Sequence, residues 1–139
     1  MRRGAARLLA AGLAVAAVGS CSSPHPSSAR VVHVEERDFR ISMTHHLAPG
    51  DYVLSVHNSG PVNHELIVVR ATHPDLPLRS DGYTVDEESM QHDEVGALEP
   101  GAPGAVRELP VHLTPGRYEV FCNMAGHYFG GMRSSLVVS

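Results

Sequence analysis

The sequence predicts an all-β protein, an antiparallel Greek-key β-sandwich. Apolar residues alternate with polar ones over several short segments, and Gly, Pro and Asn gather between those segments. A third observation is one long interruption of this rhythm, at residues 70–104. We therefore expect seven or eight short strands with a single insertion between them.

The first expected strands lie on either side of a charged run. Val32 and Val34 share one face, the run Glu35–Asp38 follows, and Phe39 and Ile41 then resume the alternation. This pattern indicates two short strands or one bent strand. Further strands are expected at residues 52–57, 62–69, 106–113, 117–121 and 135–139, separated by Pro-Gly and Asn-Ser-Gly-Pro turns.

The insertion contains prolines and an acidic cluster. Thr84 and Glu87 have the spacing of a capping box, acidic residues follow in the expected first turn, and Gly96 suits a helix end. We expect a short helix near residues 85–95. We interpret its acidic residues as a solvated helix face rather than a docking site for a basic redox partner.

The N-terminus has the features of an export signal. Arginines precede the apolar run Leu8–Val18, which is too short to span a membrane, and Val18-Gly19-Ser20-Cys21 resembles a bacterial lipobox. We expect a lipoprotein signal peptide at 1–20, lipid attachment at Cys21, a flexible tether at 21–29 and one domain at 30–139. The alternatives are ordinary cleavage near Ser20 with a free Cys21, or a disulfide between Cys21 and Cys122.

Composition narrows the functional classes. Without residues 1–20 the chain keeps 8 of its 11 basic residues and all 15 acidic ones, so its net charge is −7. There is no lysine and no basic patch, which argues against a nucleic-acid partner. We expect an exported monomer, anchored on the outer face of a bacterial cytoplasmic membrane or periplasmic.

The C-terminal segment carries the residues suited to metal chemistry. Cys122, His127 and Met132 follow one another at even spacing, directly after an expected strand. A thiolate, an imidazole and a thioether suit copper that cycles between Cu(I) and Cu(II), and a second imidazole would complete the set. His64, at the start of the apolar run Leu66–Val69, is the natural source of that imidazole. Glu65, pointing to the opposite face, is expected to be a solvated carboxylate.

One upstream His followed by Cys-x4-His-x4-Met near the end of a small all-β chain resembles the blue-copper (cupredoxin) family, of plastocyanin or azurin type. The loop spacing is similar to that of rusticyanin and sulfocyanin. The resemblance implies one copper ion with His64, Cys122 and His127 as equatorial ligands and Met132 as the weak axial ligand. It also implies a non-enzymatic electron carrier for redox proteins such as a cytochrome or an oxidase, with the ring edge of His127 near the surface. Tyr128, Phe129 and Met124 are expected to form an apolar patch around that ring, with core packing as the alternative role for Phe129.

The same residues allow other functions and other metal sites to be considered. A copper delivery or storage module could use the same ligands without cycling electrons. A binuclear copper site would need a second loop cysteine where Gly126 stands, and this ligand set suits zinc poorly. Cysteine catalysis would need a cleft of which the sequence shows no sign. The adjacent His45 and His46 are interpreted as a turn pair, because neighbouring residues of an extended chain face opposite ways.

Overall fold

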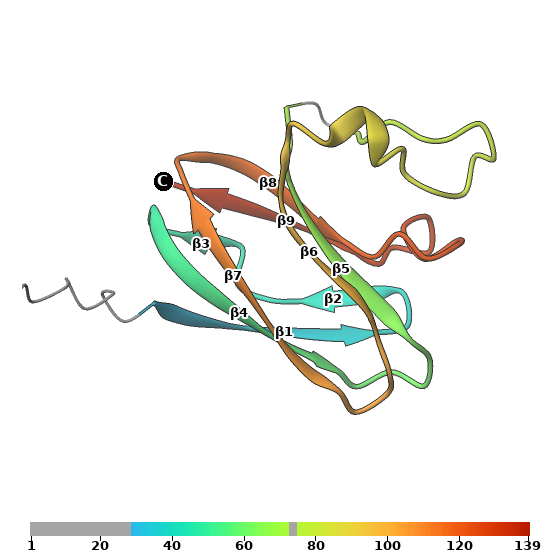
Figure 1. Cartoon of the computed structure of the whole chain (residues 1–139), viewed down its shortest axis with the longest axis horizontal. Coiled ribbons are helices and arrows are strands. Elements are labelled where there is room, and N and C mark those ends of the chain that lie inside the picture. The colour runs from blue at the N-terminus through green and yellow to red at the C-terminus, as the bar shows by residue number, and fades with distance from the viewer. Residues whose placement is uncertain (1–28, 73–74) are drawn as a thin grey trace, which may run out of the picture.

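The computed structural model describes residues 29–72 and 75–139, which form nine strands in two packed sheets (Figure 1). The expected signal peptide, Cys21 and the tether up to residue 28 lie outside the described residues. Within the described part of the chain, no helix has the length and apolar character needed to cross a membrane. The strands are β1 (Arg30–Arg37), β2 (Arg40–Ser42), β3 (His46–Leu47), β4 (Gly50–Asn58), β5 (His64–Arg70), β6 (Glu94–Gly101), β7 (Val106–Leu113), β8 (Gly116–Phe121) and β9 (Arg133–Val138).

The predicted β-sandwich is confirmed, but its sheets are mixed rather than purely antiparallel. One sheet has the order β2-β1-β4-β7 and the other β3-β9-β8-β5-β6. β1 and β4 are parallel, as are β3 and β9, while the other pairs are antiparallel. The reason is that the chain leaves β2 for the second sheet before it returns as β4, so β4 runs in the same direction as β1.

The prediction of a helix at residues 85–95 is wrong. Within residues 85–95 the structure has one 3-10 turn, Glu88–Met90, and β6 already begins at Glu94. The Glu87 side chain does not cap this turn; its Oε1 accepts a hydrogen bond from Asn123 Nδ2 at 2.5 Å. β6 instead pairs with β5, so the supposed insertion supplies an edge strand that the sequence pattern did not reveal.

Apolar residues form two clusters on opposite faces of the second sheet. Leu66, Val68 and Val120 face the interior of the sandwich, where they pack with residues of the first sheet. Ile67 and Phe121 face outward and are covered by the segment 75–90. Both faces of β5 and of the end of β8 are therefore buried, which explains their nearly continuous apolar sequences.

The charged run in β1 does not break the strand. β1 continues to Arg37, and Glu36 is fully buried, with its Oε2 accepting a hydrogen bond from Arg107 Nη2 at 2.5 Å. Burial raises the pKa of Glu36, and the Arg107 guanidinium acts in the opposite direction. The turn after β1 consists of Asp38 and Phe39 only, so the two-strand interpretation is confirmed and Phe39 belongs to the turn.

Candidate metal centre

Three of the four predicted ligands come together at one end of the sandwich. Ligand atoms of His64, Cys122 and His127 all lie within 4.8 Å of one another. Nδ1 of His127 is 3.3 Å from Nδ1 of His64 and 3.5 Å from Cys122 Sγ. Figure 1 shows the loop after β8 and the turns β1–β2 and β4–β5 at this same end.

The loop that holds Cys122 and His127 is closed by backbone hydrogen bonds. The Met132 N–H donates to the His127 carbonyl at 3.0 Å, and the Cys122 N–H donates to the Met132 carbonyl at 3.1 Å. Gly126 and Gly131 have φ values of 82° and 102°, which favour glycine. Met132 is fully buried and packs in the same cluster as Cys122. Three predicted ligands are thus tied to one another by main-chain contacts.

Strand alternation places His64 and Cys122 on the inner face. His64 precedes Leu66 and Val68 at even spacing in β5, and Cys122 follows Tyr118 and Val120 in the same way. Val68 is paired with Val120 across the two strands, so both ligands extend toward the same end. His64 and Cys122 are both fully buried, whereas His127 is partly exposed.

Burial disfavours the charged forms of the two buried predicted ligands. Burial lowers the pKa of His64, the nearby His127 lowers it further, and the Asp38 carboxylate opposes both. Burial raises the pKa of the Cys122 thiol to about 11. A neutral imidazole can coordinate a metal directly, whereas the thiol must first lose its proton.

The turn Asp38-Phe39 packs against both histidines. Asp38 Oδ1 lies 3.0 Å from Nε2 of His64, and the Phe39 ring meets the His127 ring edge-on at 5.7 Å. Phe39 has a φ of 61°, a left-handed conformation that costs a non-glycine residue about 1–2 kcal/mol. A Cβ on Gly130 would lie 2.1 Å from Phe39 Cδ1, so the turn fits closely over the metal loop.

Asn123 ties the segment 75–90 to the metal loop. Its Oδ1 accepts the Val85 N–H at 2.6 Å, and its Nδ2 donates to the Val85 carbonyl at 3.0 Å as well as to Glu87. Glu65 is partly buried, and its pKa is raised by burial and by the neighbouring Glu87. Glu65 is therefore only partly solvated, and it does not belong to the cluster of His64, Cys122 and His127.

Comparison with solved structures places this arrangement in a known architecture. Auracyanin B is 20% identical with a TM-score of 0.61 and covers 80% of this chain and 89% of its own. Auracyanin A from Chloroflexus aurantiacus, described as a blue copper protein, is 15% identical with a TM-score of 0.55, covering 78% and 99%. Rusticyanin from Thiobacillus ferrooxidans is 17% identical with a TM-score of 0.56, covering 81% and 79%. The chain has the cupredoxin fold. No family model matches the sequence, and no curated protein is similar to it in sequence.

On this cupredoxin fold, the surface around His127 differs in part from expectation. Phe129, within the loop, is 56% exposed, as an apolar surface patch requires, and the exposed Phe39 adds to this patch. Tyr128, which was expected in the patch, is buried against Phe121. Met124 packs against the main core. The sequence did not reveal Phe39 because its alternation with Ile41 resembled a strand.

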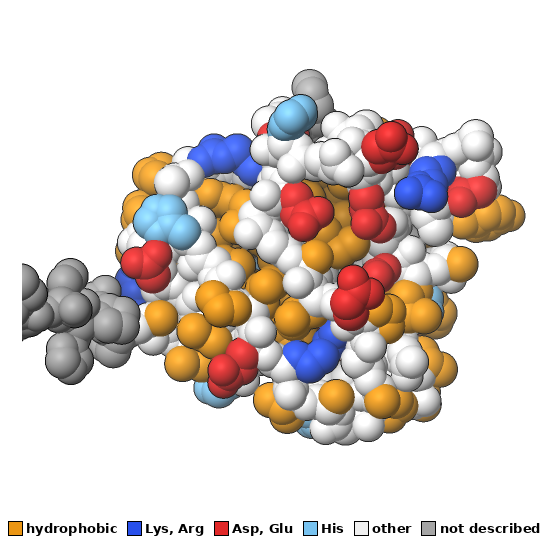
Figure 2. Space-filling view, viewed as in Figure 1, with side chains coloured by type: hydrophobic (Ala, Val, Ile, Leu, Met, Phe, Trp, Pro, Cys, Tyr) orange, Lys and Arg blue, Asp and Glu red, His pale blue; other side chains and the backbone are white. Residues whose placement is uncertain are grey.

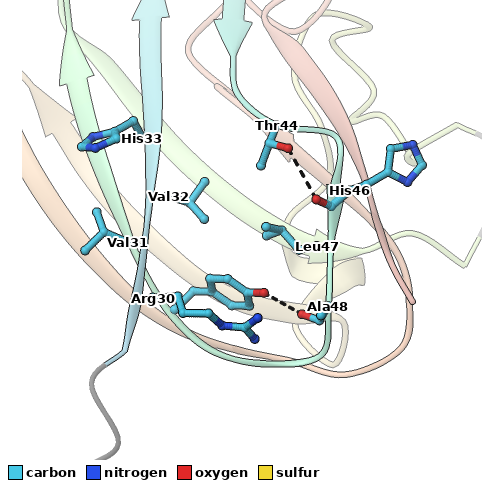
Figure 3. Close-up of a pocket in the computed structure, with 9 residues that line it drawn as sticks. Arg30, Val31, Val32, His33, Thr44, His46, Leu47 and Ala48 are labelled. Atoms are coloured by element: carbon cyan, nitrogen blue, oxygen red, sulfur yellow. Dashed lines mark hydrogen bonds between the residues drawn. The ribbon is translucent and has the colours of Figure 1, made fainter.

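The other histidines of the described segments 29–72 and 75–139 join no such cluster. A hollow of about 440 Å³ lies between β1 and β3, lined in part by His33 and His46 (Figure 3). Both rings point away from this hollow in Figure 3. His45 contacts the Ser135 carbonyl through Nδ1 at 3.0 Å. The turn-pair interpretation holds for His45, which lies at a bend, but not for His46, which begins strand β3 and pairs with Val137.

Acidic side chains on the face shown in Figure 2 are interspersed with arginines and apolar side chains rather than forming one continuous patch. Asp86 accepts hydrogen bonds from Ser89 through its own carboxylate and carbonyl, and both residues belong to the turn region rather than to a helix face. These contacts are local to residues 86–89.

Proposed function

We propose that this protein is a mononuclear type 1 (blue) copper protein that carries single electrons between redox partners, and that it is not an enzyme. The observation that carries the proposal is the convergence of His64, Cys122 and His127 at one end of a cupredoxin fold. Met132, buried beside Cys122 and bonded through its backbone to the same loop, is proposed as the weak axial ligand.

The residues present fit copper better than other metals. Two imidazoles, one thiolate and one thioether combine soft sulfur for Cu(I) with nitrogen that suits both oxidation states. When bound, copper would supply one-electron chemistry by alternating between Cu(I) and Cu(II). The protein contributes a cage fixed by strands β5 and β8 and by the closed loop, so the ligands need little movement when the charge of the ion changes.

His127 is proposed as the route by which electrons enter and leave. It is the partly exposed member of the cluster, and Phe39 and Phe129 provide apolar surface near it. An apolar rim around one exposed ligand suits brief contacts with another redox protein, such as a cytochrome or an oxidase. Burial of His64 and Cys122 excludes solvent from the other ligands.

We also propose that the protein is exported and lipid-anchored through Cys21. The support is the Arg-rich and apolar pattern of residues 1–20 and the lipobox-like Val18-Gly19-Ser20-Cys21. Replacing Cys21 with Ala should release the protein from membranes into the soluble fraction. Unchanged fractionation of the Cys21→Ala variant would reject lipid anchoring.

An electron carrier and a copper delivery module differ in what the metal does. Cyclic voltammetry of the copper-loaded protein should give a reversible one-electron wave, because the ligands are held in place in both oxidation states. Rapid loss of Cu(I) to an excess of a competing chelator, without a reversible wave, would instead favour delivery or storage. The buried positions of His64 and Cys122 predict slow loss of the metal.

A further inference from the structure

We propose that Asp38 is a positioning residue for the metal centre: its carboxylate accepts a hydrogen bond from Nε2–H of His64 and thereby directs Nδ1 of His64 toward the metal. This inference rests on the proposed function, since it assigns a role toward the same site. It adds a residue that contacts no metal and lies outside the four ligands.

The first observation is the contact itself. Asp38 Oδ1 is 3.0 Å from His64 Nε2, and both atoms are buried. The ring N–H does not point straight at the oxygen, so the pair is a close contact and not a well-formed hydrogen bond, and neither atom has another partner among the described residues. Two buried polar atoms at this distance, with no alternative partner, satisfy each other if the ring turns slightly.

The second observation is the arrangement of the two ring nitrogens of His64. Nδ1 faces His127, at 3.3 Å, while Nε2 faces Asp38. A histidine that binds a metal through one nitrogen commonly donates its other N–H to an oxygen acceptor, which fixes the tautomer and the ring orientation. Asp38 stands where that acceptor is needed.

The third observation is the space around the contact. A Cβ on Gly60 would lie 2.8 Å from His64 Nε2 and 3.1 Å from Asp38 Oδ1. The turn after β4 therefore closes over the pair and requires a residue without a side chain. On the other side, the Phe39 ring of the turn Asp38-Phe39 packs so closely on Gly130 that a Cβ added to Gly130 would overlap it. Asp38 is thus enclosed by Gly60 on one side, and the adjacent Phe39 packs against Gly130.

The test compares Asp38→Ala, Asp38→Asn and the control Asp51→Asn in the full chain. Asp51 also contacts a histidine, His112, at 2.6 Å, but that pair is exposed and lies at the start of β4, whereas the metal cluster lies beyond its end. Copper affinity is measured by competition with a chelator. In the Cu(I) form, which is diamagnetic, the His64 Nε2–H proton is followed by NMR as a direct report on the contact.

The wild type should show a slowly exchanging Nε2–H resonance. Asp38→Ala should make this proton exchange at least about tenfold faster and lower the copper affinity by about 10–100-fold. Asp38→Asn keeps an oxygen acceptor, so it should retain a protected but shifted resonance and lose less affinity than Asp38→Ala. Asp51→Asn should match the wild type in both measurements.

An Asp38→Ala protein that keeps the thiolate-to-copper colour, the protected resonance and wild-type affinity would overturn the positioning role and leave the proposed function intact. If Asp38→Ala does not fold, Asp38→Asn decides, and an unshifted resonance with unchanged affinity would overturn it. If the wild type itself binds copper without that colour, the proposed function fails and the role of Asp38 fails with it.

Discussion

The Nδ1 atom of His64 lies 3.3 Å from Nδ1 of His127, although 63 residues separate the two histidines in the chain. Strand β5 supplies the first and the loop after β8 supplies the second, and the pairing of β5 with β8 brings them together. Two ring nitrogens that face each other at this distance beside a buried thiol form a site that can coordinate a metal ion.

Replacing Met132 with Gln should retain copper and lower its reduction potential. The amide oxygen of Gln is a harder ligand than the thioether and favours Cu(II) over Cu(I). Met132 is fully buried, so the new side chain would lie where solvent does not reach. Voltammetry of the loaded protein measures the shift, and a potential equal to that of the wild type would show that Met132 does not approach the metal.

The stability of the metal-free protein should fall between about pH 9 and pH 11 because of Cys122. The pKa of this thiol is raised from 9.0 to about 11 by burial, so in this window the unfolded chain has lost the proton and the folded chain still holds it. The folded state binds more protons, and stability therefore decreases as pH rises, by about 3 kcal/mol in total.

Chemical denaturation at several pH values checks this prediction, with Cys122→Ser as the control because its hydroxyl does not titrate in the same range. Tyrosines also titrate in this window, so the informative quantity is the difference between the two proteins. Parallel pH profiles for wild type and Cys122→Ser would contradict the assignment.

Asn123→Ala should lower the free energy of unfolding by about 1–3 kcal/mol, since it leaves the backbone groups of Val85 without their buried partner. Amide hydrogen exchange at Val85 should become faster, because its N–H donates to Asn123 Oδ1. Gln91→Ala, an exposed change in the same segment, is the matched control and should stay within about 0.5 kcal/mol of wild type. Equal effects of the two substitutions would refute the role given to Asn123.

Gly130→Ala should destabilise the protein by about 1–3 kcal/mol by displacing the Phe39 ring, which its Cβ would meet at 2.1 Å. In a Phe39→Ala background the same substitution should cost much less, because the overlapping ring is gone. A double-mutant cycle measures this coupling by denaturation. Additive effects of the two substitutions would show that Phe39 does not pack on the metal loop.

The sequence predicted the sandwich from strand alternation, and it predicted the cluster of His64, Cys122 and His127 because the Cys-x4-His-x4-Met spacing with one upstream histidine resembles a known ligand set. It did not predict β6, whose sequence contains Gly96 and Pro100 and lacks strong alternation, yet pairs along β5. Asp38 and Asn123 were missed for a different reason. Their partners, His64 and Val85, are distant in sequence, so nothing in their own neighbourhood distinguishes them from surface residues.

Glu36 is a buried charged residue that the sequence likewise did not reveal, because its partner is distant in the chain. A run of charged residues in a strand pattern indicates solvent exposure, but pairing with Arg107 places this carboxylate in the interior. Only the register of β4 with β1 and β7 brings Glu36 and Arg107 into contact. Local composition carries no information on such a pair.

The most direct test of the central claim is the visible absorption and electron paramagnetic resonance spectrum of the purified protein after addition of Cu(II), followed by titration with a mild reductant. We expect one copper ion per chain, an intense visible band from the Cys122 thiolate, narrow copper hyperfine splitting, and reversible bleaching on reduction. Cys122→Ser should lose the band. A pale Cu(II) spectrum with ordinary hyperfine splitting in the wild-type protein would show that the four residues do not act together, and would contradict the proposed electron carrier.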